Sequence, residues 1–596
     1  MNQPLWLTTA AALVQTAAAA ADPIYLEQGP NWTNVARADF YTRDQGSQLI
    51  KYAWLKALSH PDGQPFLGDQ LSRYGYLPNP GNPDALPVGF TKAAEYVGMN
   101  CAACHTRQIK VAGHEYRVDG GPALVDAQGM FADLDKAVAG VLATDESFQT
   151  FARKVLPGPT VSDAAQLKAE VNAWFLRYDT LIQRGLPVQS WGPGRMDAVG
   201  MIFNRLTGLD IGPPPSFIIA ENIKRADAPV RYPFLWNAAI QDMTQWPGFA
   251  KNGSDLLGLA RNLGEVYGVF ASFEPKKKWY SPLGIDYLHN NSANFDGLGR
   301  LEGLIKKIGP PKFPWPTDPK LVARGKAVYE AKNSCASCHG INPGETRFLD
   351  NKTWSTPIQD VGTDSREYDT MKWTARAGVL EGKEIPFITP RIKPVDESFN
   401  ILRISVAGTI IQNAVPLLAS TVEGLEESSV ENLLESEGLK RFAAPLDRAR
   451  QKFQLPSSLK ELIDAFNKDA RPAPPAAVAA KAAAQAPAAN PQEEPYRYAS
   501  RVLQGIWATA PYLHNGSVPT LEDLLNPAAK RPKSFKIGPD YDIQKVGMAA
   551  EQTKFGDQTL SIVPERNSGN SNVGHEFGTT LSDDDKKALL EYLKTL

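Results

Sequence analysis

The chain has 596 residues, with 63 Lys and Arg against 65 Asp and Glu and a net charge of −2. This length exceeds what one hydrophobic core normally supports, so we expect two or three domains. The balanced charge gives no electrostatic reason to expect nucleic acid as a partner. No internal stretch approaches about 18 consecutive apolar residues, so we expect no membrane span.

The N-terminus has the composition of a secretion signal. Residues 5–21 are apolar and rich in Ala, and small residues precede Asp22. The basic residues that usually open such a signal are missing, because the first Lys or Arg is Arg37. We interpret residues 1–22 as a signal-like leader and expect a periplasmic or secreted protein.

Helices joined by long loops are the main prediction for the rest of the chain. Apolar residues at helical spacing predict helices over 44–58, 131–151 and 164–184. A further apolar helix is predicted over 196–203, after a Gly-Pro-Gly turn. The Pro/Ala tract at 471–495 has few large apolar residues, so we predict a mobile loop there.

A Pro-rich stretch at 310–319 marks the predicted boundary between an N-terminal domain at 23–315 and a C-terminal domain at 316–596. Residues 321–329 predict the first helix of the C-terminal domain. Amphipathic spacing after Ser582 predicts its last helix. We expect these two helices to pack crosswise on each other.

All four cysteines of the chain fall into two C-x-x-C-H segments, which are Cys101, Cys104 and His105, and Cys335, Cys338 and His339. This spacing is the attachment signature of a c-type haem. Two thiols three positions apart can bond the two vinyl groups of one porphyrin, and the histidine that follows can bind the iron. We therefore predict two covalently bound haems, each with a proximal histidine.

Two other interpretations of the paired cysteines are less well supported by the sequence. A structural zinc ion could take four thiolates, although zinc pairs usually lie closer along the chain than these two pairs. A thioredoxin-like motif would need a βαβ context, and we find no strand-like alternation beside either segment. Haem attachment in bacteria takes place outside the cytoplasmic membrane, which agrees with an exported protein.

The sixth ligand of each iron decides what the haem does, because a six-coordinate haem transfers electrons whereas an open face can bind O2 or peroxide. Among the seven histidines, His514 is the best distal candidate for the second haem, opposite His339, and Met548 is the rival. For the first haem, His114 is too close in sequence to His105 to reach the opposite face. We therefore expect an open first haem and a saturated second haem.

The two C-x-x-C-H segments, residues 507–521 (Trp-Ala-Thr-Ala-Pro-Tyr-Leu-His-Asn-Gly-Ser-Val-Pro-Thr-Leu) and residues 574–578 (Gly-His-Glu-Phe-Gly) resemble the diheme cytochrome c peroxidase superfamily. The likeness extends from about Asp44 onward and is greatest to the branch of rubber (latex) oxygenases and diheme fatty-acid dioxygenases. It implies a mainly α fold of two cytochrome c-type haem domains with long loops. The wide separation of the two motifs predicts a helical insertion in the N-terminal domain, which would form the substrate pocket.

The resemblance also implies roles for individual residues. His105 would be the proximal ligand of the O2-binding haem, and His339 and His514 would ligate the second haem. An aromatic residue near both haems is implied, and we place it at Trp246. The helix at 196–203 would then line the distal pocket.

Three further residues complete the predicted catalytic set with Trp246. Arg195 and Arg261 are candidates for contacts to haem propionates or bound oxygen, with an ordinary surface arginine as the alternative for each. Glu265 is a candidate for the acid/base group that a peroxidase needs above its iron.

The favoured function is an oxygenase that adds O2 to C=C bonds of an apolar substrate, either an unsaturated fatty acid or polyisoprene. The alternative is a peroxidase that uses H2O2 and takes electrons from a donor cytochrome. A diheme electron carrier is the third option, but it would need two six-coordinate irons and no long insertion. A structural calcium ion is a further cofactor that we consider.

Overall fold

The computed structural model describes residues 22–279, 283–346, 352–385, 388–414, 496–555 and 558–596. It is 38 % helix and 14 % strand, so the expected mainly α fold is met only in part. The strands are short and pair mostly in two-stranded antiparallel ladders, and such short strands leave no long run of alternating residues in the sequence. The predicted loop at 471–495 and residues 1–21 of the predicted leader lie outside the described residues.

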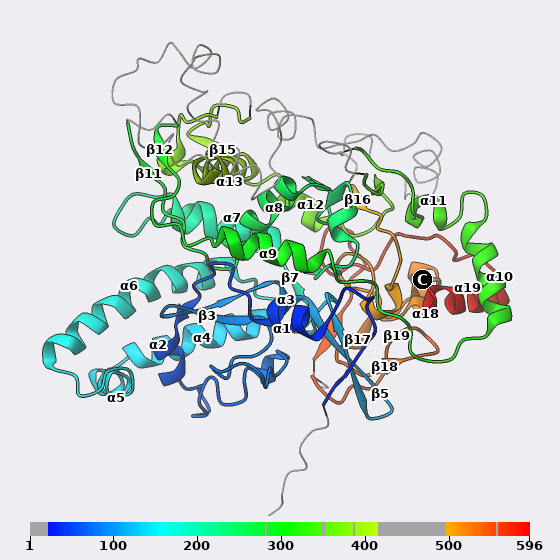
Figure 1. Cartoon of the computed structure of the whole chain (residues 1–596), viewed down its shortest axis with the longest axis horizontal. Coiled ribbons are helices and arrows are strands. Elements are labelled where there is room, and N and C mark those ends of the chain that lie inside the picture. Colours follow the sequence, from blue (N-terminus) through cyan, green and yellow to red (C-terminus); the bar gives the residue numbers. More distant parts are fainter. Residues whose placement is uncertain (1–21, 280–282, 347–351, 386–387, 415–495, 556–557) are drawn as a thin grey trace, which may run out of the picture.

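The α-helices of the described residues are α1 (Asn34–Thr42), α2 (Tyr52–Ala57), α3 (Cys101–Cys104), α4 (Ala127–Leu142), α5 (Asp145–Val155), α6 (Val161–Gly185), α7 (Ala198–Arg205), α8 (Asp255–Gly268), α9 (Phe295–Ile305), α10 (Pro319–Glu330), α11 (Ala336–His339), α12 (Arg366–Thr370), α13 (Ser398–Ala414), α18 (Leu521–Leu524) and α19 (Asp583–Lys594). Figure 1 shows α4, α5 and α6 as an arm on one side and α10, α11 and α19 at the opposite end.

The strands form two three-stranded sheets and several two-stranded ladders. The three-stranded sheets have the orders β1-β6-β5 and β2-β4-β3, in which only β1 and β6 pair in parallel. Their strands are β1 (Ile24–Tyr25), β2 (Ile50–Lys51), β3 (Phe90–Ala93), β4 (Tyr96–Met99), β5 (Thr106–Val111) and β6 (His114–Asp119). The ladders pair β7 (Arg195–Met196) with β8 (Val230–Arg231), β9 (Met243–Thr244) with β10 (Ala250–Lys251), β11 (Lys276–Lys277) with β12 (Ile285–Asp286), β13 (Ile358–Gln359) with β16 (Tyr498–Ala499), β14 (Thr374–Arg376) with β15 (Val395–Glu397), β17 (Ser534–Lys536) with β20 (Thr559–Ser561), and β18 (Tyr541–Asp542) with β19 (Gly547–Met548).

In the arm of α4, α5 and α6, one predicted helix is confirmed and another is found to be two helices. The helix predicted over 164–184 is α6, which begins with a capping box between Thr160 and Asp163. The helix predicted over 131–151 is instead two helices, α4 and α5. Thr144 separates them because its side chain caps the first turn of α5 by accepting from the Ser147 amide.

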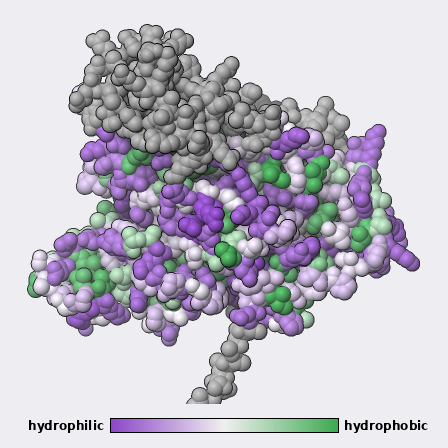
Figure 2. Space-filling model, in the orientation of Figure 1, coloured by the Kyte–Doolittle hydropathy of each residue, from purple (hydrophilic) through white to green (hydrophobic). Residues whose placement is uncertain are grey.

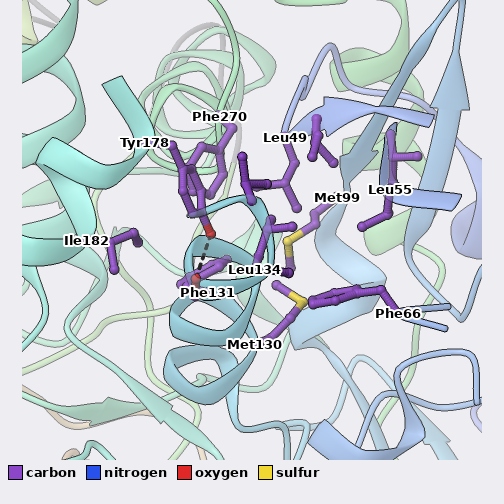
Figure 3. Close-up of a cluster of buried hydrophobic side chains, with 14 of the residues drawn as sticks. Leu49, Leu55, Phe66, Met99, Met130, Phe131, Leu134, Tyr178, Ile182 and Phe270 are labelled. Atoms are coloured by element: carbon purple, nitrogen blue, oxygen red, sulfur yellow. Dashed lines mark hydrogen bonds between the residues drawn. The ribbon is translucent and has the colours of Figure 1, made fainter. Parts of the chain in front are cut away.

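A large hydrophobic cluster lies where this arm meets the rest of the N-terminal half (Figure 3). Phe131 of α4, Tyr178 of α6 and Phe270 pack together, with ring centroids 5.5 Å apart for Phe131 and Phe270 and 5.9 Å apart for Tyr178 and Phe270. The Tyr178 hydroxyl donates a hydrogen bond of 3.1 Å to the Phe131 carbonyl oxygen. The arm is therefore anchored at its base by aromatic packing.

The helix predicted over 44–58 is only partly formed, because its first part pairs as a strand. The Leu49 amide donates to the Val97 carbonyl oxygen, and Ile50 lies opposite Val97 in the β2–β4 ladder. Helix α2 begins only at Tyr52. Strands thus precede the first C-x-x-C-H segment, and the hairpin of β5 and β6 follows it. Our prediction of no strands beside this segment was wrong.

Helix α7 confirms the helix predicted over 196–203, with bounds shifted toward the C-terminus. The Asp197 side chain caps it by accepting from the Gly200 amide, and the chain continues beyond α7 as a π-helical turn over Leu206–Asp210. Val199 and Phe203 belong to a buried hydrophobic cluster that α7 shares with α8 and α13. Helix α7 is thus an internal helix of the fold.

The first and last helices of the C-terminal half, α10 and α19, are both confirmed and cross each other closely (Figure 1). The Ser582 side chain caps α19 by accepting from the Asp585 amide. Another hydrophobic cluster includes Trp236 of the N-terminal half together with Trp507 and Leu589 of the C-terminal half. The two predicted domains therefore share buried packing, and the division at residue 316 stays a prediction.

The crossing of α10 and α19 depends on a glycine. A Cβ atom on Gly325 would lie 2.0 Å from the Ala588 carbonyl oxygen, which is main chain and cannot move aside. Gly325→Ala is therefore expected to lower the free energy of unfolding by about 2–3 kcal/mol, measured by thermal unfolding of the holoprotein. Gly140→Ala in α4 is the matched control, because a Cβ there meets no atom within 4 Å, and it should stabilise by up to about 1 kcal/mol. Equal effects of the two substitutions would contradict close helix crossing.

Figure 2 shows a mostly hydrophilic face on which apolar residues lie scattered among polar ones. Within the described residues, no helix is both long and apolar enough to cross a membrane.

Candidate functional site

The first C-x-x-C-H segment forms a single helical turn. Helix α3 begins at Cys101, and the side-chain oxygen of the preceding Asn100 accepts a hydrogen bond of 2.9 Å from the Ala102 amide. One turn of helix brings Cys101 and Cys104 to the same side, directly before His105. The local fold therefore presents two thiols and an imidazole together.

The His105 imidazole is held by a main-chain carbonyl group. Its Nδ1 atom lies 2.8 Å from the Pro233 carbonyl oxygen, so Nδ1 carries the proton and Nε2 is left free to bind a metal. Burial lowers the pKa of His105 to about 4, and the ring is therefore neutral, as a metal ligand must be. Burial also raises the pKa of the Cys101 and Cys104 thiols, that of Cys104 to about 12.

His339 of the second segment is held in the same way. Its Nδ1 atom lies 2.7 Å from the Arg501 carbonyl oxygen, and burial lowers its pKa. The hydroxyl of Tyr329 in α10 donates a hydrogen bond of 3.0 Å to the His339 carbonyl oxygen. The main chain of Arg501 thus plays for His339 the part that Pro233 plays for His105.

A second histidine, His575, faces His339. The two ring centroids are 6.2 Å apart and the ring planes are inclined by 47°. A metal ion bound by both imidazoles, with bonds of about 2 Å, would separate the two centroids by roughly 6 Å. Burial lowers the pKa of His575 to about 3, and within the described residues its buried Nδ1 atom has no hydrogen-bond partner. A neutral imidazole opposite His339 would suit a second ligand of a metal ion held there.

The loop that carries His575 is fixed by its backbone conformation and by Arg531. His575 has a φ of +50° and follows Gly574 at +76°, a region that is strained for a residue with a Cβ atom. Buried Arg531 donates hydrogen bonds to the carbonyl oxygens of Asn572, Gly574 and His575. One arginine therefore holds the main chain that places the His575 ring.

His514, which we predicted as the ligand opposite His339, makes different contacts. Its ring stacks on Tyr498, with centroids 3.9 Å apart and planes inclined by 17°. Its carbonyl oxygen accepts a hydrogen bond of 2.9 Å from the Arg231 amide. In the part of the chain that the structure describes, the imidazole that faces His339 is that of His575.

The sequence around His575 does contain a feature that indicates a ligand, although the spacing of the histidines alone did not favour it over His514. It lies between Gly574 and Gly578 in a segment that contributes to the family resemblance, and such glycines permit the backbone turn that the ring needs. Met548, the rival ligand, is 3 % exposed in β19 and belongs to a buried hydrophobic cluster.

Trp246 lies between the two chain segments that hold the proximal histidines. Its indole Nε1 donates a hydrogen bond of 3.0 Å to the Arg231 carbonyl oxygen, and its own carbonyl oxygen accepts one of 2.8 Å from the Ala499 amide. Arg231 lies two residues before Pro233, and Ala499 lies two residues before Arg501. The expected place for an aromatic residue between two haems is therefore compatible with these contacts.

Arg195 is completely buried, so the alternative of an ordinary surface arginine does not apply to it. Its Nη1 atom donates to the Asn570 side-chain oxygen at 2.8 Å and to the Asn515 carbonyl oxygen at 3.2 Å. Its Nε and Nη2 atoms have no partner within the described residues, and burial lowers its pKa to about 9. A buried cation with unused donors fits an anionic group such as a propionate.

Arg261 and Glu265 lie together near the first thiol. The Nη2 atom of Arg261 lies 2.6 Å from Glu302, and its Nε atom lies 4.0 Å from Glu265. Glu265 accepts a hydrogen bond of 2.9 Å from Gln245. Burial raises the pKa of Glu265, which Arg261 opposes, and these charges also influence the pKa of Cys101. Arg261 is therefore paired with the Glu302 carboxylate, and the Glu265 side chain, which is 42 % exposed, lies at the edge of this group.

These donors fit a haem c. Each segment offers two cysteines that form no disulfide and an imidazole whose Nδ1 atom is held by a main-chain carbonyl oxygen, and thiols and an imidazole are the groups that bond the two vinyl positions and the iron. Among the described residues, no three His, Cys, Asp or Glu side chains gather as a metal cluster. The four cysteines therefore do not form the tetrahedral site that a structural zinc ion requires. The donors of the two segments thus point to the class of cytochrome c-like proteins.

Comparison with known proteins agrees with this class. Residues 497–536 match the model of the family described as RoxA-like, cytochrome c-like. This segment holds both Arg501 and His514. A cytochrome c-like domain binds haem c, and the match indicates a haem-dependent oxidoreductase.

Two relatives come from Sinorhizobium fredii (strain NBRC 101917 / NGR234). The chain is 29 % identical over 627 residues to "Uncharacterized protein y4iJ", which covers 96 % of this chain and 93 % of that protein. It is 39 % identical over 117 residues to "Uncharacterized protein y4iM", which covers 16 % of this chain and 27 % of that protein.

Proposed function

We propose that the protein is a diheme c-type oxygenase that adds O2 to C=C bonds of an apolar substrate, an unsaturated fatty acid or polyisoprene. Catalysis takes place at the N-terminal haem site, and the C-terminal haem site stores and transfers electrons. The N-terminal haem site is formed by Cys101, Cys104 and His105, and the C-terminal haem site by Cys335, Cys338, His339 and His575. In this proposal the protein works in the periplasm or outside the cell.

The observation that carries the proposal is the inequality of the two histidine sites. His339 faces a second imidazole, whereas the ring contact of His105 within the described residues is the edge of Tyr232, 6.1 Å away between centroids. Tyr232 directly precedes Pro233, whose carbonyl oxygen holds the Nδ1 atom of His105, and its ring has no imidazole nitrogen to offer a metal. Two imidazoles suit electron transfer, and one imidazole leaves a coordination position for oxygen.

When bound, haem supplies the iron that binds and activates oxygen. The chain's own contribution is to hold one neutral imidazole nitrogen toward the iron and to position an apolar substrate. We place the substrate pocket beside helix α7, as expected from the resemblance, and the Val199, Phe203 and Leu263 side chains pack in one buried hydrophobic cluster that would support the pocket wall. Arg195 offers its unused N–H groups to a propionate, which would orient the porphyrin.

One observation favours the alternative of a peroxidase. Glu265 is a carboxyl group with a raised pKa near the first thiol, and a peroxidase needs such a group to move a proton between the two oxygen atoms of H2O2. In that case electrons would arrive through the C-terminal haem site from a donor cytochrome. A simple electron carrier would require a second axial ligand at both sites.

Trp246→Ala is expected to slow turnover by roughly 10-fold or more while both haems stay attached, because the indole joins the two segments that hold His105 and His339. Steady-state turnover and a haem count on the same sample measure this. Trp246→Phe, which keeps an aromatic ring but loses the hydrogen bond to Arg231, separates the two contributions. Unchanged turnover in Trp246→Ala would remove this residue from the proposal.

Product analysis tests the proposed reaction directly. The holoprotein is incubated under air with oleate and, separately, with latex, and the products are analysed by mass spectrometry. Incorporation of 18O from labelled O2 into a hydroperoxide or a carbonyl cleavage product is the expected result. Products that form only with added H2O2 and a donor cytochrome would instead establish the peroxidase.

A further inference from the structure

Arg501 makes hydrogen bonds in both of the chain segments that hold the proximal histidines. Its carbonyl oxygen accepts the hydrogen bond from His339 Nδ1 at 2.7 Å. Its side-chain Nη1 atom donates a hydrogen bond of 2.8 Å to the Phe234 carbonyl oxygen. Phe234 directly follows Pro233, whose carbonyl oxygen holds His105 Nδ1 at 2.8 Å. A short chain of hydrogen bonds and covalent bonds therefore runs from one imidazole to the other through a single arginine.

The Arg501 guanidinium is fixed on three sides. Its carbon atom lies 3.8 Å from the centroid of the Phe234 ring, and that ring stacks on Trp236 at 4.8 Å. Its Nε atom donates a hydrogen bond of 3.1 Å to the side-chain oxygen of Gln241. An arginine with this many planar contacts has one orientation, and lysine could not reproduce them.

The charge of Arg501 is buried without a compensating carboxylate. Only 9 % of the residue is exposed, and within the described residues no acidic side chain forms an ion pair with it. Burial, with Arg231 and Arg261 nearby, lowers its pKa to about 9, so the group is still cationic at neutral pH. Its buried Nη2 atom has no hydrogen-bond partner among the described residues. A buried cation with a free donor acts over a distance in a low dielectric and accepts a nearby anion.

We propose that Arg501 is a positioning residue shared by both haem sites, which sets the orientation of the two proximal imidazoles and stabilises the reduced iron at both positions with one buried positive charge. This inference rests on the proposed function only in requiring two haems. A positive charge close to an iron favours the ferrous form over the ferric form, because reduction removes one positive charge from the iron. Loss of the cation should therefore disfavour reduction at both sites together.

The test is spectroelectrochemical titration of the purified holoprotein, with a haem count and mass spectrum first. In Arg501→Gln the ratio of reduced to oxidised iron, at each wild-type midpoint potential, is expected to fall about tenfold at both haems. A tenfold change corresponds to about 59 mV for a one-electron couple. Arg501→Lys should restore most of this ratio at both haems, because it keeps the charge, although it loses the fork of hydrogen bonds. Loss of packing alone would not be reversed by lysine.

Arg531→Gln is the matched control. Arg531 is also a buried arginine that donates to main-chain carbonyl groups, but those carbonyls belong to the loop of His575. It should therefore change only the C-terminal haem. The inference is overturned if Arg501→Gln changes the midpoint potential of one haem and leaves that of the other unchanged. It is also overturned if Arg501→Lys lowers both midpoint potentials as much as Arg501→Gln does. A wild-type protein with fewer than two haems would instead refute the proposed function.

Discussion

His575→Ala is expected to convert the C-terminal haem from a six-coordinate, low-spin form into a form with an open coordination position. The physical reason is the 6.2 Å separation of the His339 and His575 ring centroids, which leaves room for one metal ion between two imidazoles. Alanine removes one of the two nitrogen ligands and leaves the thiols and His339 in place. The change should affect the whole population of that haem, since the substitution removes the His575 imidazole from every chain.

Absorption and EPR spectra of the oxidised protein measure the spin state, and carbon monoxide added to the reduced protein reports the open position. The wild-type protein should bind one carbon monoxide per chain, and His575→Ala should bind two. His514→Ala is the control, because the His514 ring stacks on Tyr498. It should lower stability locally and keep the low-spin signal. A loss of that signal in His514→Ala, with His575→Ala unchanged, would reinstate the assignment made from the sequence.

Features that depend on a few consecutive residues could be predicted from the sequence. Covalent attachment needs two thiols and an imidazole within five positions, and both segments satisfy it with all four cysteines. Helices α10 and α19 could also be predicted, since amphipathic spacing and the Ser582 cap are local features. These predictions required no knowledge of how distant segments meet.

The partners of the histidines could not be predicted in this way. Pro233 and Arg501 hold the two proximal rings through their carbonyl oxygens, and a main-chain carbonyl is present at every residue. Residue type therefore gives no signal, and only tertiary packing selects these two. The His575 ring depends likewise on a positive φ and on carbonyl bonds from Arg531, 44 residues earlier in the chain.

The predicted helix over 44–58 failed for a related reason. Its apolar residues do have helical spacing, but Leu49 and Ile50 find hydrogen-bond partners in β4, immediately before Cys101. Non-local pairing therefore overrides the local preference for helix, as it often does for short apolar segments. The same pairing joins the residues before α2 to the strand before Cys101, which spacing along the chain does not reveal.

The double variant Cys101→Ala/Cys104→Ala is expected to lose oxygen-dependent product formation by at least roughly three orders of magnitude, because haem c attachment at the N-terminal haem site requires these thiols. Cys335→Ala/Cys338→Ala is the matched variant at the other site. It should keep carbon monoxide binding at the N-terminal haem while turnover falls, since only the electron-storing site is removed. Product yield, haem count and carbon monoxide binding are measured on both.

The comparison of the two double variants separates the roles of the sites more sharply than either variant alone. Loss of a haem could loosen the fold in both cases, because Cys101 and Cys335 both pack against the hydrophobic cluster that contains Trp507. A general loosening would therefore lower all three readouts in parallel. If the two haem sites have different roles, carbon monoxide binding should disappear only in Cys101→Ala/Cys104→Ala. The reason is that His105 lacks the facing imidazole that His575 provides to His339. If carbon monoxide binding instead disappeared only with the second pair, the oxygen site would have to be moved to His339.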